Sequence, residues 1–142
     1  MTDIINVKLD EGAFMPERAH EEDAGADIRT PRAFSIEPRG SATIHTGVHV
    51  ELPYGTVGMI KTKSGLNHNH DIVTEGVIDR GYTGEIVVKM HNLGDQHKFF
   101  NRGDKITQLV VMPIVLTKFR EVSMVFGGER GDSGFGSTDG QA

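Results

Sequence analysis

An aspartate and a tyrosine lie close together in a glycine-rich segment, and their side chains could take part in a hydrolytic reaction. The segment spans residues 76–85 and reads GVIDRGYTGE, with Asp79 directly after two apolar residues and Tyr82 directly after Gly81. A carboxylate that is partly desolvated at a turn can take a proton from an attacking water. Asp79 is therefore a candidate general base. Read alone, the segment fits an ordinary turn aspartate equally well.

A second segment carries groups that bind phosphate. Residues 61–66 read KTKSGL and place Lys63, Ser64 and Gly65 directly after a strand-like run. Backbone N–H groups, a hydroxyl and a positive charge in one loop can hold phosphate oxygens. A solvated turn is the commoner outcome for such a sequence, so this segment indicates phosphate binding only in combination with others.

Two polar residues stand in runs that otherwise favour strands. Gln108 lies within the apolar run 105–114, and if buried it needs a hydrogen-bonding partner from the backbone, another chain or a ligand. Asp27 follows Gly25 at the start of another such run. This placement can hold a carboxylate at a sheet edge, although a simple glycine turn also explains it.

The C-terminal residues have the composition of a flexible arm. Residues 127–142 are rich in Gly, Ser, Asp and Thr and cannot form a core, so we expect a β domain over residues 1–126 and a mobile arm over residues 127–142. Glycines on both sides of Phe135 would let its ring stack on a flat ligand, a contact of about 1–3 kcal/mol. Arg130, Ser137 and Thr138 add a bidentate cation and two hydroxyls that suit phosphate.

Length, charge and composition limit the class of protein. A chain of 142 residues has room for one domain, and its net charge of −5 argues against a nucleic-acid polymer as partner. The N-terminal residues lack a signal-peptide pattern, no run approaches the length of a membrane span, and Cys is absent. We therefore expect no membrane association and a cytoplasmic location. His68 and His70 match no zinc-site spacing, which argues against metal ligation by histidine.

Short runs with alternating polar and apolar residues predict an all-β fold. They are rich in β-branched residues and separated by Gly, Pro or Asp, which is typical of a β-sandwich or barrel. The predicted strands cover residues 4–9, 42–52, 56–61, 85–91 and 105–114. A short helical turn at residues 67–71 is the only helix that the pattern allows.

Five segments, taken together and in order, resemble the five motifs of the homotrimeric all-β dUTPases. They span residues 24–28, 63–66, 76–84, 103–109 and 130–138. The resemblance implies a jelly-roll-like subunit and a threefold homotrimer with active sites at the subunit interfaces, each closed by a C-terminal arm from a neighbour. It also implies hydrolysis of dUTP to dUMP and pyrophosphate, which limits uracil in DNA and supplies dUMP for thymidylate synthesis.

The same resemblance implies roles for individual residues. Asp79 would activate the water that attacks the α-phosphorus, Tyr82 would pack under the deoxyribose, and Asp27 would lie near the water shell of a magnesium ion. That ion would be held mainly by the substrate phosphates. The remaining predicted contacts are uracil with the backbone of Gly76, Val77 and Ile78 and the ring of Phe135, the α- and β-phosphates with Lys63, Ser64, Gly65 and Gln108, and the γ-phosphate end with Arg130, Gly136, Ser137 and Thr138.

Two positions depart from the family pattern, and three rival functions stay open. Lys63 stands where an arginine is usual, and Gly81 stands where a second aspartate is usual. A dCTP deaminase would share the fold but would carry a glutamate where Lys89 lies. The chain could also be a catalytically silent nucleotide-binding regulator or a generic β interaction module. The family assignment predicts the cytoplasm of a bacterium or of a virus- or phage-infected cell.

Overall fold

Residues 4–136 are described by the computed structural model, and within them the chain forms ten strands and one short helix. The prediction of an all-β fold is confirmed. The strands are β1 (Asn6–Leu9), β2 (Gly25–Arg29), β3 (Phe34–Ile36), β4 (Ser41–His45), β5 (Val48–Glu51), β6 (Thr56–Lys61), β7 (Ile72–Ile78), β8 (Val87–Asn92), β9 (Lys98–Phe100) and β10 (Lys105–Pro113), and the helix is α1 (Ser64–His70).

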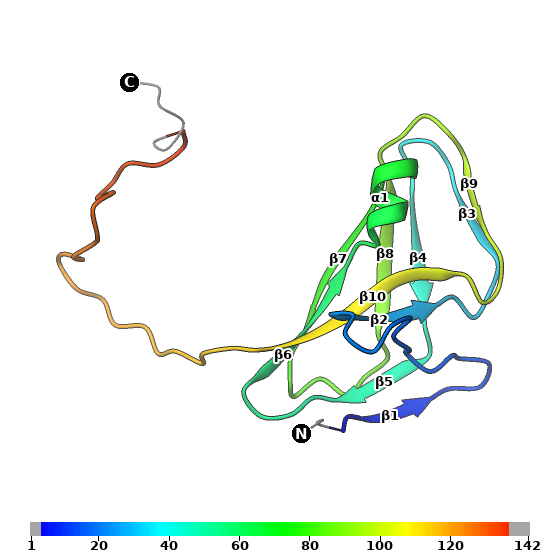
Figure 1. Ribbon diagram of the computed structural model, residues 1–142, viewed down its shortest axis with the longest axis horizontal. Helices are drawn as coiled ribbons and strands as arrows, with labels where there is room; N and C mark the ends of the chain where they lie inside the picture. Colours follow the sequence, from blue (N-terminus) through cyan, green and yellow to red (C-terminus); the bar gives the residue numbers. More distant parts are fainter. Residues whose placement is uncertain (1–3, 137–142) are drawn as a thin grey trace.

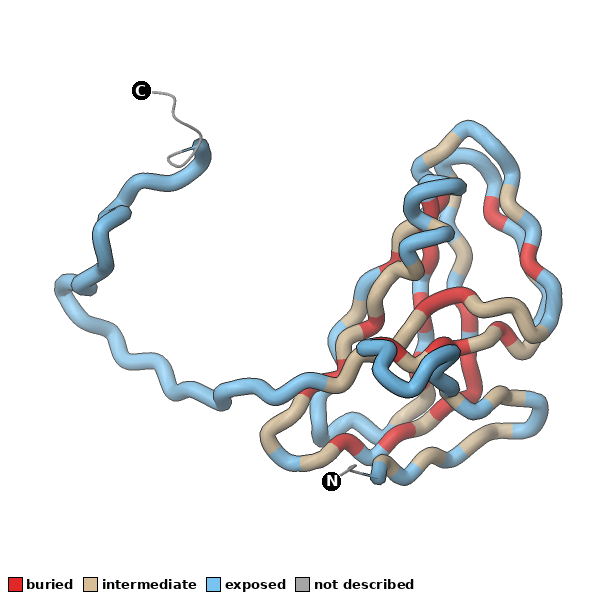
Figure 2. The backbone as a smooth tube through the Cα atoms, in the orientation of Figure 1, coloured by how far each residue is buried: buried red, intermediate tan, exposed pale blue. Residues whose placement is uncertain are grey.

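The strands form three antiparallel sheets around one core (Figure 1). The largest has the order β2-β10-β6-β7-β8-β4, and the pairs β1-β5 and β3-β9 complete the body. Side chains alternate between the interior and solvent, most regularly on β8, where Val88 and Met90 are buried and their neighbours are exposed. Figure 2 shows the buried positions gathered on the strands of this body. The largest fully buried apolar side chains are Ile28, Ile36, Ile60, Ile72, Ile86, Met90, Ile106 and Val48.

Strand β7 changes partner along its length, and this opens a wide loop. Its residues 72–74 pair with β8, whereas residues 75–78 pair with β6. Because β7 and β8 separate after the third pair, residues 79–86 form a broad connection between them. No tight hairpin therefore closes residues 76–85, although β7 and β8 are consecutive and antiparallel. The physical reason is that β8 pairs with β4 over residues 87–91 and follows that strand away from β7.

Two local predictions are also corrected. The single strand expected over residues 42–52 is divided into β4 and β5 by Thr46 and by Gly47, whose φ is +70°. The buried Thr46 hydroxyl donates a hydrogen bond to the Ile86 carbonyl at 2.5 Å, which fixes this corner. The helical turn expected at residues 67–71 begins three residues earlier as α1 and ends at Asp71, whose φ of 54° is left-handed.

The chain leaves the body directly after β10. The Ile114 N–H donates to the Gly55 carbonyl at 2.8 Å, and residues 115–136 then run outward as an exposed chain (Figures 1 and 2). Residues 115–126, which we call the apolar segment, expose Val115, Leu116, Phe119, Val122, Met124, Val125 and Phe126. The domain boundary at residue 126 stays a prediction, because this segment has the composition of a buried element but its residues are exposed in the single chain. Among residues 4–136, no helix is long and apolar enough to cross a membrane.

Candidate active site

The 79–86 loop and the strands that flank it line a cavity of about 250 Å³. Val77 and Ile78 from β7 and Val87 from β8 supply apolar walls, and the loop supplies Asp79 and Tyr82. The carboxylate of Asp79 is exposed to solvent, and the Tyr82 N–H donates to the Asp79 carbonyl at 2.9 Å, which closes the first turn of the loop. Glu85 of the loop also lines the cavity, which therefore combines apolar surface with two carboxylates and one phenol ring.

The lack of a side chain at Gly84 allows the ring of Tyr82 to lie across the loop. A Cβ on Gly84 would fall 2.7 Å from both the Tyr82 hydroxyl oxygen and the adjacent ring carbon, which is closer than any side chain permits. The Tyr82 hydroxyl crosses this glycine and donates to the Glu85 carbonyl at 2.6 Å. Gly84 has no role of its own in the sequence-based prediction, although its position two residues after the tyrosine was the available signal.

The predicted phosphate-binding residues converge from three elements. Strand β10 places Gln108 opposite Asp27 of β2 on one side and opposite Lys61 of β6 on the other. The Gln108 amide donates to the Thr62 carbonyl at 3.1 Å, beside the point where Lys63 precedes α1. Its side chain passes over Gly25, where a Cβ would clash with the amide oxygen. Ser64 and Gly65, predicted as loop residues, form the first turn of α1.

Asp27 is buried and bonded to two lysines. Its side chain forms ion pairs with Lys63 and, at 3.0 Å, with Lys105 at the start of β10. Burial alone would raise the pKa of the Asp27 carboxyl, but the hydrogen bonds and charges of the two ammonium groups outweigh it and hold that pKa below its usual value. Lys105 could not be found from the sequence, because nothing local indicates that it pairs with a residue on another strand.

The described residues provide no preformed metal cage. Over residues 4–136, no three His, Asp or Glu side chains converge on one point. Both oxygens of Asp27 are bonded to lysine ammonium groups, and His68 and His70 lie exposed on α1. Such a donor set is compatible with a magnesium ion that is held mainly by a phosphate ligand. The water-mediated magnesium role of Asp27 stays a prediction.

The two groups of predicted site residues occupy different places on this chain. The lining of the 79–86 cavity includes neither Lys63, Ser64 nor Gln108. The arm lies in neither place: Arg130, Phe135 and Gly136 are exposed on the chain that leaves the body. The predicted contacts of Ser137 and Thr138 lie outside the described residues. The structure thus brings together each group but does not join the groups within one chain.

Comparison with known proteins identifies the family. The family model described as dUTPase matches residues 11–139. The chain belongs to the dUTPase family. Among curated relatives, the deoxyuridine 5'-triphosphate nucleotidohydrolase of Clostridium novyi (strain NT) is 40% identical over 134 residues, which is 92% of this chain and 94% of the relative. The enzyme of the same name from Tropheryma whipplei (strain Twist) is 41% identical over 135 residues and covers 92% of each chain.

Solved dUTPase structures have the same fold. A mutant dUTPase of Staphylococcus bacteriophage 80alpha, solved with dUpNHpp, covers 96% of this chain and 99% of its own, at 30% identity and a TM-score of 0.85. A mutant dUTPase from phage phi11 of S. aureus, described with a structural Mg(II) ion, is 30% identical with a TM-score of 0.79 and covers 86% of this chain and 98% of its own. The predictions of the family and of its jelly-roll-like β fold are confirmed.

Proposed function

We propose that this chain is a dUTP diphosphatase that hydrolyses dUTP to dUMP and pyrophosphate through water attack on the α-phosphorus. This reaction removes a precursor of uracil in DNA and supplies dUMP for thymidylate synthesis. The observation that carries the proposal is the cavity of the 79–86 loop, lined by Asp79 and Tyr82, in a chain that the dUTPase family model matches over residues 11–139.

The loop end of the site would select the base and sugar. The backbone of Gly76, Val77 and Ile78 would pair with uracil, and the ring of Tyr82, held across Gly84, would exclude a ribose 2′-hydroxyl. Uracil offers an acceptor at O4 and a donor at N3, whereas cytosine presents the reverse, so a fixed backbone would leave cytosine with unpaired polar groups. Asp79, exposed beside the cavity, would accept a proton from the attacking water.

The second group of residues would hold the phosphate chain. Lys63, Ser64, Gly65 and Gln108 would contact the α- and β-phosphates. Lys63 would act as a point charge without the bidentate fork of an arginine. Its ammonium group is already directed by Asp27, which reduces the number of positions open to a flexible lysine. Arg130, Gly136, Ser137 and Thr138 would close on the γ-phosphate end, with Phe135 stacked on uracil.

A magnesium ion bound through the three phosphates and water would neutralise charge that develops on the leaving pyrophosphate. Asp27 is the residue proposed to lie near its water shell. The carboxylates of the described residues suit this secondary role, because magnesium in phosphate-binding sites usually keeps several waters and takes few protein ligands.

The active unit is proposed to be a homotrimer with sites shared between subunits. Two observations support this arrangement: the loop cavity and the Lys63–Gln108 group lie apart on one chain, and the apolar segment is exposed. A neighbouring subunit would cover the apolar segment, and its arm would complete the site. Because the named relatives come from bacteria and from bacteriophages, the proposed location is the cytoplasm of a bacterial or phage-infected cell.

The decisive experiment is a substrate profile. Purified protein with magnesium is mixed separately with dUTP, UTP, dCTP and dTTP, and pyrophosphate release is measured. We expect dUTP to be hydrolysed and the other three to react at least about 100-fold more slowly. The site would leave polar groups of dCTP unpaired, the Tyr82 ring would exclude the 2′-hydroxyl of UTP, and the backbone that pairs with uracil would exclude the methyl group of dTTP. Inertness toward dUTP, or equal rates with dUTP and UTP, would contradict the proposal.

A further inference from the structure

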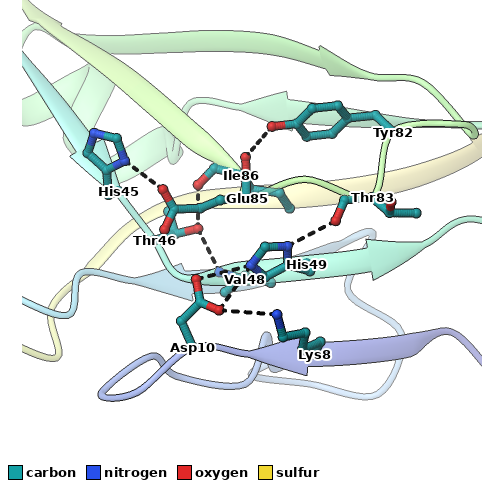
Figure 3. A network of polar contacts seen from close by, with 10 residues as sticks. All are labelled: Lys8, Asp10, His45, Thr46, Val48, His49, Tyr82, Thr83, Glu85 and Ile86. Atoms are coloured by element: carbon teal, nitrogen blue, oxygen red, sulfur yellow. Dashed lines mark hydrogen bonds and ion pairs between the residues drawn. The ribbon is translucent and has the colours of Figure 1, made fainter.

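A histidine outside the predicted motifs holds the 79–86 loop from the side. His49 lies on β5, and Figure 3 shows its ring between Asp10 and Thr83. One ring nitrogen, Nδ1, is 2.9 Å from the Thr83 carbonyl oxygen, and the other, Nε2, is 3.0 and 3.1 Å from the two carboxylate oxygens of Asp10. The side chain is 18% exposed, so water can replace few of these contacts.

The partners of the ring determine how many protons it carries. A backbone carbonyl can only accept a hydrogen bond, so Nδ1 must donate to Thr83. An ionised carboxylate can also only accept, so Nε2 must donate to Asp10. A neutral imidazole has one N–H and cannot satisfy both partners, whereas an imidazolium has two. The hydrogen bond with Asp10 is the largest cause that raises the pKa of His49, and that with His49 is the largest cause that lowers the pKa of Asp10.

We propose that His49, in its doubly protonated form, is a positioning residue for dUTP cleavage, because it fixes Thr83 and with it the ring of Tyr82. The inference rests on the proposed function. Thr83 lies between Tyr82 and Gly84, the two residues whose close contact sets the position of the phenol ring. Asp10 in turn is fixed to the body, since its N–H donates to the Gly47 carbonyl at 2.8 Å.

Other contacts fix the two ends of the 79–86 loop, and His49 contacts Thr83 in its middle. At the first turn, the guanidinium of Arg80 lies 3.3 Å from the centre of the Tyr54 ring. At the end, the ring of His45 is 2.6 Å from the Glu85 carboxylate, and the Ile86 carbonyl accepts from Thr46. Between these two anchors, the bond from His49 is the side-chain contact that reaches Thr83 from the β1-β5 sheet (Figure 3).

The surrounding charges set the direction of the pH dependence. Lys8 on β1 lies 3.7 Å from Asp10, and its positive charge opposes protonation of His49. The other charged groups nearby are Glu51, further along β5, and Glu85 of the loop, which is bonded to His45. Because the pKa of His49 is raised in the folded protein above its usual value of 6.5, the double contact with Thr83 and Asp10 is present below that pH while Asp10 is ionised. It is lost as the pH rises through that folded value. The KM for dUTP should therefore rise on the alkaline side.

Three variants test this role. In Asp10→Asn, the asparagine amide can donate to Nε2, so a neutral ring can still donate to Thr83, and the alkaline rise in KM should disappear while activity is kept. In His49→Gln, we expect a KM about tenfold higher below pH ~6.5, the size of effect expected for a lost charge-assisted hydrogen bond, with kcat little changed. The control is His20→Gln, because His20 forms a similar pair with Asp23 at 3.1 Å on an exposed turn.

Nitrogen-15 NMR of the imidazole rings in nucleotide-free protein provides a readout that is independent of turnover. We expect His49 to lose its second proton at a pH above about 6.5, the usual midpoint of a histidine, and the Thr83 and Gly84 amide signals to shift as His49 titrates. A midpoint at or below pH ~6.5, or a titration that leaves those amides and the KM unchanged, would overturn the inference. Intact His49 signals in a protein that never hydrolyses dUTP would instead overturn the proposed function.

Discussion

Asp79 is the residue on which the proposed chemistry depends, because an attacking water needs a base beside the α-phosphorus. Asp79→Asn keeps the shape of the side chain and removes its basicity. We expect kcat to fall by about 10²–10⁴-fold, the range for loss of a general base. The affinity for a non-hydrolysable dUTP analogue, measured by calorimetry, should stay within a few-fold. Asp95→Asn is the control, since Asp95 lies exposed and pairs with Arg39 at 2.8 Å. Unchanged turnover in Asp79→Asn would remove Asp79 as the base.

Gly84 permits a second test at the scale of one residue. In Gly84→Ala, the added methyl group would lie 2.7 Å from the Tyr82 hydroxyl, so the ring must move. We expect the preference for dUTP over UTP, measured as a ratio of kcat/KM values, to fall by about tenfold or more, because a misplaced ring no longer excludes the 2′-hydroxyl. Gly81→Ala is the matched comparison in the same loop, as nothing lies within 4 Å of its added Cβ. Equal effects from both variants would contradict the assigned role of Gly84.

At the scale of elements, Asp27 connects β2 to the start of β10 and to the residue before α1. Removing one partner of a buried ion pair leaves the other charges unpaired, so Asp27→Asn should lower the free energy of unfolding at pH 7 by about 2–3 kcal/mol. Lys105 is partly exposed and can be solvated by water, so the loss should be smaller than for a fully buried pair. Urea denaturation measures the difference. Glu75→Gln, which breaks the exposed pair with Lys61, should have a much smaller effect.

The difference in unfolding free energy between the wild type and Asp27→Asn should depend on pH, because the pKa of Asp27 is lowered in the folded protein. An unfolded aspartate titrates near pH ~3.9, and the folded one titrates below that value. The stabilisation is therefore fully present above about pH 4 and is lost as the pH falls through the folded pKa. The difference in unfolding free energy between the wild type and Asp27→Asn should therefore become smaller as the pH falls below about 4. A difference that is constant from pH 7 to pH 3 would show that the lysine pairs do not stabilise the fold.

The sequence predicted elements where the local pattern and the tertiary environment agree. The alternation in β6 and β10 indicates strands, and both strands lie in the largest sheet. The pattern could not reveal the break at Thr46 and Gly47, because the alternation continues on both sides while the corner depends on the distant Ile86 carbonyl. Nor could it reveal that β7 changes partner, since each half of the strand looks alike and only the partners differ.

In the candidate site, too, the sequence predicts local features but not contacts between residues that are far apart in the chain. Asp79 and Tyr82 could be predicted as site residues because their chemistry and their spacing to glycines are local features. The contacts of His49, Lys105 and Gly25 could not be predicted, because each contacts a residue far away in the sequence: Thr83, Asp27 and Gln108, respectively. The resemblance to the family supplied the substrate, which no local feature specifies.

At the scale of the whole molecule, the arm and the apolar segment should have separable roles. Deleting residues 128–142 removes Arg130 and Phe135, and we expect kcat/KM for dUTP to fall by more than about tenfold, because the phosphate end of the substrate is no longer positioned. The mass of the assembly, measured by light scattering, should correspond to three chains as before. Dissociation of this truncated protein would show that the arm is a structural element.

A second variant, in which Phe119 and Phe126 are both replaced by serine, changes the apolar segment and keeps the arm. Phe119 and Phe126 are 97% and 91% exposed in the single chain, so replacing both with serine should leave the folded body intact. If a neighbouring subunit covers these rings, the change should lower the assembly mass to that of one chain at micromolar concentration and abolish turnover. An unchanged mass would place the contact between subunits elsewhere.

The position of the apolar segment after β10 also imposes an order on biosynthesis. Strand β10 pairs with both β2 and β6, so the largest sheet cannot close until β10 has left the ribosome. The apolar segment is translated after β10 and reaches solvent later still. Domains generally fold as units during synthesis, in the order in which the chain emerges. Each newly made subunit can therefore complete its own sheets before it exposes the apolar surface by which it could capture an unfinished neighbour.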